Sequence, residues 1–95
     1  MPSIAFWRRG AYYFMMHYVY ILKSKKYNEV YTGSTSNLKE RVIEHNSGKS
    51  SHTKKFKPWK LVTYFAFEDK VTAQNFEEYL KTGSGIAFSR KHFNS

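Results

Sequence analysis

The sequence predicts an α+β fold, with a small, mainly antiparallel, three-stranded sheet flanked by helices. Short aromatic and β-branched runs at 18–22, 29–32 and 59–68 are typical of strands. Apolar residues recur at helical spacing in 38–46 and again beyond residue 72, which indicates two helices. The order strand, strand, helix, strand, helix favours the α+β class. At 95 residues the chain has room for one modest core.

The first two strands are expected to form a hairpin. The run 18–22 is apolar throughout and short, as in a buried strand. A polar connection leads to the second strand at 29–32, which Gly33 is expected to end. The third run is the longest, and we expect it to be the central strand. Strict alternation divides that strand into two faces: Leu61, Thr63, Phe65 and Phe67 against Val62, Tyr64 and Ala66.

Local signals bracket the first helix near 38–46. Asn37 is a good N-cap, Glu40 follows three residues later as in a capping box, and Gly48 provides a stop. The stretch 49–60, "KSSHTKKFKPWK", is polar and basic, which indicates a loop.

Within the first helix, Arg41 and His45 form a stripe beside the apolar Leu38 and Val42, at the border of the core. Two interpretations stay open. Either Arg41 pairs with a nearby acid at a solvated edge, or the stripe provides a forked phosphate donor with a titratable neighbour.

The second helix is expected from about Thr72 and should end before the glycines of "TGSGIAF". Glu77, three residues before Leu80, aligns with the inward apolar stripe, whereas Glu78 points away. A carboxylate there needs a compensating charge. Either Arg41 pairs with it, or a divalent cation is held there by oxygen ligands and water.

Tyr20 and Tyr31 fall on the two hairpin strands. Tyrosines on a small sheet are usually packing residues with a wet hydroxyl. A phenol becomes a candidate proton acceptor only where nearby cations lower its pKa. The sequence has no Gly-rich phosphate loop, no His-Glu-x-x-His pair and no tight metal-ligand spacing among its histidines.

The composition favours a polyanionic partner. Sixteen Lys and Arg face seven Asp and Glu, a formal charge of +9, so nucleic acid is the first candidate, although a merely basic globule stays open. The absence of cysteine excludes disulfides and thiolate metal sites and fits the cytoplasm. No apolar run approaches the roughly 20 residues that span a bilayer. Residues 1–15 read differently from the rest and are interpreted as an appended or alternatively translated extension before a domain at 16–95.

In order, "YVYIL", "YTG", the helix with Arg41-x-x-x-His45, "PWKLV" and "AQNFEEYLK" closely resemble the GIY-YIG nuclease superfamily, especially its small single-domain members. The resemblance covers about residues 16–93. It places Tyr20 and Tyr31 on the key tyrosines of the two eponymous motifs. Arg41, His45 and Glu77 match the family's arginine, histidine and metal-binding glutamate. Within the two motifs Tyr18 replaces the eponymous Gly, and Val19 and Thr32 each replace Ile. Outside them, Ser89 stands near a frequent asparagine, and Ser34 stands where some members have lysine.

The resemblance implies a DNA endonuclease that hydrolyses phosphodiester bonds around one Mg²⁺ or Mn²⁺ ion. In this interpretation Glu77 anchors the metal and Arg41 holds the scissile phosphate. Tyr20 takes a proton from the attacking water, assisted by Tyr31 or His45. These side chains are expected to gather in one pocket at the sheet edge.

Lysines of the basic loop would contact the DNA backbone, although a merely solvated loop is nearly as good an explanation for each one: Lys54, Lys55, Lys57 and Lys60. We expect no recognition helix or zinc module beside this domain, so specificity would come from DNA shape, as in repair or recombination structures, or from a targeting protein. Two rival interpretations are a nucleic-acid-binding module with little turnover and a protein-interaction adaptor with incidental basicity.

Overall fold

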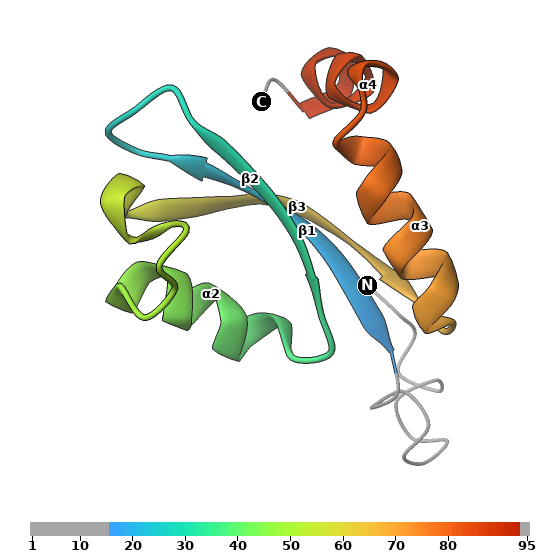
Figure 1. The fold of residues 1–95 in the computed structure, drawn as a ribbon, viewed down its shortest axis with the longest axis horizontal. Coiled ribbons are helices and arrows are strands. Elements are labelled where there is room, and N and C mark those ends of the chain that lie inside the picture. The colour runs from blue at the N-terminus through green and yellow to red at the C-terminus, as the bar shows by residue number, and fades with distance from the viewer. Residues whose placement is uncertain (1–15, 94–95) are drawn as a thin grey trace.

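The computed structural model describes residues 16–93, and the extension predicted at 1–15 lies outside this range. A three-stranded antiparallel sheet lies between one helix on one face and two helices on the other (Figure 1). The elements in chain order are β1 (His17–Ser24), β2 (Val30–Thr35), α2 (Leu38–Ser47), the short 3₁₀ turn η2 (Lys54–Phe56), β3 (Trp59–Phe67), α3 (Lys70–Leu80) and α4 (Gly83–Phe93). The predicted α+β class is confirmed. None of the helices within 16–93 has the length and apolar character needed to cross a membrane.

The strand order is β2-β1-β3, so the prediction that 59–68 is the central strand was wrong. The central strand is β1, where four consecutive residues, Val19 to Leu22, have no exposed surface. A strand covered on both faces and both edges can be apolar at every position. β3 is longer, but it alternates half-buried with exposed residues along most of its length, as an edge strand does.

β2 is also longer than predicted, and Gly33 lies inside it rather than at its end. Gly33 pairs with Tyr20 on β1. A Cβ atom built on Gly33 would lie 2.6 Å from the Tyr20 hydroxyl oxygen and 2.9 Å from Cε2 of Tyr31. The glycine therefore makes room for two tyrosine rings and is not a strand breaker.

Strict alternation along β3 fails at a bulge. The register with β1 shifts between Ile21, which faces Thr63, and Leu22, which faces Leu61, so that Val62 is the extra residue. Val62 and Phe65 consequently pack in the same core, while Leu61 packs on the opposite face.

The two faces of the sheet carry separate cores. On the α2 side Tyr20, Leu22 and Trp59 form the buried cluster. On the other side the residues with helical spacing in α3 cover the remaining β1 side chains; this cluster contains Val19, Ile21, Ala73 and Leu80. Because β1 contributes alternate residues to both, it fixes the two layers relative to each other.

The caps of α2 were predicted correctly. The Asn37 side chain accepts a hydrogen bond from the backbone N–H of Glu40, and Gly48 ends the helix with φ of 86°. The α3 helix starts two residues earlier than expected, because Asp69 accepts from the N–H of Thr72.

Helix α4 was not predicted, because the glycines of "TGSGIAF" were interpreted only as a stop. Gly85 instead allows α4 to approach the end of α3. A Cβ there would lie 1.9 Å from the carbonyl oxygen of Tyr79 and 2.5 Å from Cα of Leu80. The side chain of Thr82 accepts from the N–H of Gly85 at the start of the helix.

Candidate active site

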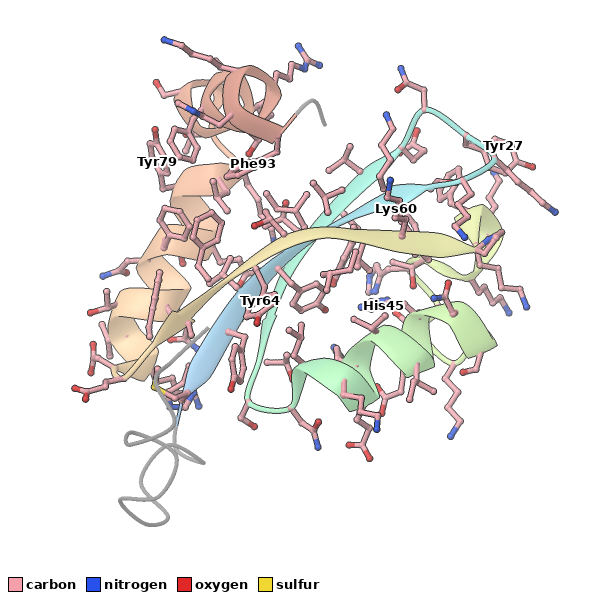
Figure 2. All side chains as sticks on the ribbon, turned by 180° about the vertical axis from the view of Figure 1, so that it is seen from behind. Tyr27, His45, Lys60, Tyr64, Tyr79 and Phe93 are labelled. Atoms are coloured by element: carbon pink, nitrogen blue, oxygen red, sulfur yellow. The ribbon has the colours of Figure 1, made fainter. Side chains whose placement is uncertain are left out.

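A buried chain of hydrogen bonds links the sheet to α2 and to the basic loop. The Tyr20 hydroxyl lies 2.8 Å from Nε2 of His45, and Nδ1 of His45 lies 2.7 Å from Oγ1 of Thr53. All three side chains are almost completely buried. Figure 2 shows His45 between α2 and the sheet. The expectations that His45 borders the core and that Tyr20 has a wet hydroxyl were therefore wrong.

The basic loop is held beneath this chain by further hydrogen bonds. The indole N–H of Trp59 donates to the backbone carbonyl of Thr53 over 3.0 Å. The Asn46 side chain bonds to both the N–H and the carbonyl of Trp59. These contacts fix the Thr53 hydroxyl against His45, which explains how a loop residue becomes part of the site.

Burial determines the protonation of both groups. It raises the pKa of Tyr20 to about 12, although the nearby Arg41 partly opposes this. Burial also lowers the pKa of His45, and the positive charge of Arg41 lowers it further. At neutral pH the phenol therefore keeps its proton, and the imidazole is uncharged.

Arg41 pairs with Glu44, one turn further along α2, at 3.0 Å. The prediction that Arg41 meets a nearby acid is confirmed, but its partner is not Glu77. The guanidinium also interacts with Tyr20, and these contacts raise the pKa of Arg41. Its side chain keeps 43% of its surface exposed, so it is accessible to an anionic ligand.

Glu77 lies on the opposite face of the sheet from these groups. Its Oε1 accepts a hydrogen bond from the Ser34 hydroxyl at 2.7 Å, and its Oε2 accepts from Nζ of Lys81, also at 2.7 Å. Burial acts to raise the pKa of Glu77, but the hydrogen bonds from Lys81 and Ser34 outweigh it, and the net pKa is lowered. Glu77 is therefore ionised at neutral pH.

The two halves approach each other around edge strand β2. Gly33 pairs with Tyr20 and faces the phenols, whereas the next residue, Ser34, pairs with Val19 and holds Glu77 on the other face. Burial is the main cause of the raised pKa of Tyr20, and the negative charge of Glu77 adds the smallest contribution to it. The expectation of a single pocket at the sheet edge is corrected: the phenols and the carboxylate lie on opposite faces and flank edge strand β2. Figure 1 looks onto this edge, with α2 and α3 on either side of β2.

The model of the GIY-YIG catalytic domain matches residues 16–86. The chain belongs to the GIY-YIG family. The matched segment includes every residue discussed so far in this site, from Tyr20 on β1 to Lys81 at the end of α3. Membership of this family places the protein among nucleases.

Relatives of this GIY-YIG chain carry the name UPF0213. A UPF0213 protein of Clostridium perfringens is 46% identical over 67 residues, which are 70% of this chain and 71% of the relative. One from Staphylococcus haemolyticus is 44% identical over 69 residues, 72% of this chain and 83% of the relative. The solution structure of a UPF0213 protein from Bacillus halodurans is 34% identical and covers 77% of this chain and 80% of that chain, with a TM-score of 0.48.

Two contacts of the GIY-YIG site were missed from the sequence. Ser34, noted only as a departure from the family pattern, binds the carboxylate of Glu77. Lys81 binds the same carboxylate and could have been found, because it follows Glu77 at helical spacing i,i+4. Thr53 gave no signal, since nothing in the sequence relates a loop hydroxyl to a histidine eight residues earlier.

The lysines predicted to bind DNA are all exposed. Lys54 and Lys55 are on η2, and Lys57 follows it. Lys60 is on β3, at the opposite edge of the sheet from Gly33 (Figure 2).

Proposed function

We propose that this protein is a DNA endonuclease that hydrolyses phosphodiester bonds with Mg²⁺ or Mn²⁺ as cofactor. One observation carries the proposal. Consecutive residues of an edge strand, Gly33 and Ser34, contact Tyr20 on one side and Glu77 on the other. A phosphodiester lying along that edge would have a guanidinium and an ionised carboxylate on its two sides, with the hydrogen-bonded phenol of Tyr20 buried directly behind Gly33.

The residues around Glu77 fit a largely hydrated ion. Within 16–93 no three or more His, Asp or Glu side chains lie close enough together to coordinate one metal ion. Protein side chains of this range would therefore supply only part of the ligands of an ion. Mg²⁺ commonly binds through one or two carboxylates, with water and substrate phosphate as the remaining ligands. Glu77 would hold the ion, and the Lys81 ammonium would have to leave Oε2. Such an ion supplies charge to stabilise the phosphoryl oxygens.

Arg41 is suited to the scissile phosphate. Its guanidinium is accessible, is tied down by Glu44 at one nitrogen, and has further N–H donors for a phosphate oxygen. Negative charge accumulates on that phosphate as the reaction proceeds, so a fixed cation at this position favours the transition state.

Tyr20 accepts a proton from the attacking water only if it passes its own proton on. With a pKa of about 12 it is no base at neutral pH. Its hydroxyl, however, is hydrogen-bonded to Nε2 of a neutral histidine. In the proposed step the water proton moves to the Tyr20 oxygen while the phenol proton moves to Nε2 of His45. The remaining hydroxide attacks phosphorus as the bond from phosphorus to the 3′ oxygen breaks. The ring of Tyr31 lies beside the rings of Tyr20 and His45 on the same face, and its hydroxyl would assist in orienting the attacking water.

A second function, DNA binding with little turnover, is favoured by two specific features. Tyr20 is fully buried, and Glu77 is already paired with Lys81. Both would have to change for the reaction to proceed.

A nicking assay on supercoiled, linear and branched DNA separates the two functions. With Mg²⁺ or Mn²⁺ the wild type should cut at least one substrate, and Glu77→Gln should reduce the rate by about 100-fold or more. Glu78→Gln is the matched control, since its exposed carboxylate neighbours Glu77 on the same helix and has no hydrogen bond within the described residues. Binding without cleavage of any substrate would leave the binding module as the function.

A further inference from the structure

A cleft of about 700 Å³ opens between the start of β2 and the helices α3 and α4. It is lined by three cationic side chains, Lys23, Lys81 and Arg90, together with polar and apolar neighbours. No aspartate or glutamate belongs to the described residues of its wall. A concave surface with cations and no acid attracts anions more strongly than the same charges on a flat face.

The cleft continues directly from the candidate active site. Lys81 is part of its wall and also binds Glu77, and Thr32 in the wall is two residues before Ser34. One turn of α3, about 5.4 Å, separates Glu77 from the cleft. This offset is of the order of the spacing between successive phosphates of one DNA strand.

Ser89 adds a buried hydroxyl to the wall. Only 7% of its surface is exposed, and its side chain makes no hydrogen bond to any residue within 16–93. A buried hydroxyl without a partner is costly, so a polar ligand in the cleft would satisfy it.

We propose that this cleft binds a backbone phosphate of DNA next to the phosphate at Glu77, through Lys23, Arg90 and the Ser89 hydroxyl. The proposal rests on the proposed function for its choice of DNA. It assigns backbone contacts to the α3 side of the β2 edge, whereas the basic loop at 49–60 packs on the α2 side. It also gives a role to α4, the helix that the sequence did not predict.

The test measures DNA binding without turnover. Fluorescence anisotropy with a short labelled duplex is carried out in EDTA, on full-length protein carrying Glu77→Gln. In this background, Lys23→Gln with Arg90→Gln should weaken binding by about tenfold and lower the slope of log Kd against log salt by about 2. The matched control, Lys26→Gln with Lys91→Gln, removes two exposed charges from the same two regions but outside the cleft. It should change affinity by less than about threefold.

Ser89→Ala is a further variant, which tests the hydroxyl of the cleft without changing the charge of the protein. It should weaken binding a few-fold with an unchanged salt slope, because a hydroxyl releases no counterion. Thermal unfolding of each variant confirms that it is folded. Equal losses in the cleft and control pairs would show that only net charge matters and would overturn the cleft proposal. In that case the proposed endonuclease would still stand if the wild-type protein cleaves DNA. If the Glu77→Gln protein binds no DNA at all, both the endonuclease proposal and the cleft proposal are overturned.

Discussion

On the α2 side of the sheet the candidate site is centred on neutral groups in the protein interior, with the charged Arg41 at its margin, whereas on the α3 side it consists of charges in contact with water. Tyr20, His45 and Thr53 satisfy one another's hydrogen bonds and are nearly inaccessible. Glu77 and Lys81 form an ion pair in which the lysine side chain is 54% exposed.

The two halves differ in how rigidly the positions of their side chains are held. A buried polar network is held in one geometry, since any displacement leaves an unsatisfied group in a low dielectric. An exposed i,i+4 ion pair contributes only a few tenths of a kcal/mol and can be exchanged for another partner. The proton-handling half is therefore rigid, and the half proposed to hold the cation can rearrange when the cation arrives.

The largest effect is expected where the rigid half meets the edge strand. Gly33→Ala would place a methyl group 2.6 Å from the Tyr20 hydroxyl oxygen. The Tyr20 ring cannot move away without breaking the hydrogen bond between its hydroxyl and Nε2 of His45. We expect a loss of about 1–3 kcal/mol in the free energy of unfolding from overpacking, and loss of cleavage. Chemical denaturation and the nicking assay measure the two effects.

Gly83→Ala is the control for this substitution. A Cβ at Gly83 meets no atom within 4 Å, and alanine favours the α4 helix that begins there. Stability should be unchanged or slightly higher. If the two alanine variants have the same stability and the same cleavage activity, the position of the Tyr20 phenol does not depend on the absence of a side chain at Gly33.

These contrasts also show which parts of the molecule the sequence determines locally. The caps at Asn37 and Gly48 depend on nearby residues, and both were predicted. The central position of β1 and the bulge at Val62 depend on how distant strands align, and neither was predicted. The role of Gly85 depends on the packing of two helices, which local turn signals do not contain.

The same distinction applies to the site. The inward position of Glu77 followed from helical periodicity, and the structure places it beside the sheet, bound to Ser34. Periodicity also placed His45 near the core, but its complete burial results from the loop that brings Thr53 over it. Which face of the sheet each group occupies depends on strand order, so the division of the site around β2 could not be predicted.

A smaller effect is expected at Thr53. Thr53→Val keeps the shape but removes the hydroxyl from Nδ1 of His45, which leaves a buried nitrogen unsatisfied at a cost of about 1–3 kcal/mol. Thr53→Ser keeps the hydroxyl and is the control. The ¹⁵N chemical shifts of the His45 ring should change in the valine variant and stay near the wild-type values in the serine variant. Unchanged ring shifts in both would mean that the Thr53 hydroxyl is not the hydrogen-bond partner of Nδ1 in solution.

The smallest effects are expected from acidification, which should reach the two halves at different pH. Below about pH 6.5 the unfolded chain binds a proton at His45, while the folded protein, whose histidine has a lowered pKa, does not. The free energy of unfolding should therefore begin to fall there. Glu77 also has a lowered pKa, so its contribution is present above about pH 4.3 and is lost only as the pH falls further. Because the carboxylate is partly exposed, that second loss should amount to a few tenths of a kcal/mol.

Two variants assign the two parts of this pH profile. His45→Gln should be less stable than the wild type at neutral pH, but its stability should vary less between pH 7 and 5, because glutamine has no proton to gain. Lys81→Gln should keep the first decline and lose much of the second, since the hydrogen bond from Lys81 is the main contact that lowers the pKa of Glu77. Urea denaturation across the pH range measures both. A first decline that is undiminished in His45→Gln would show that another group causes it, and the buried half would then not be the part that acid destabilises first.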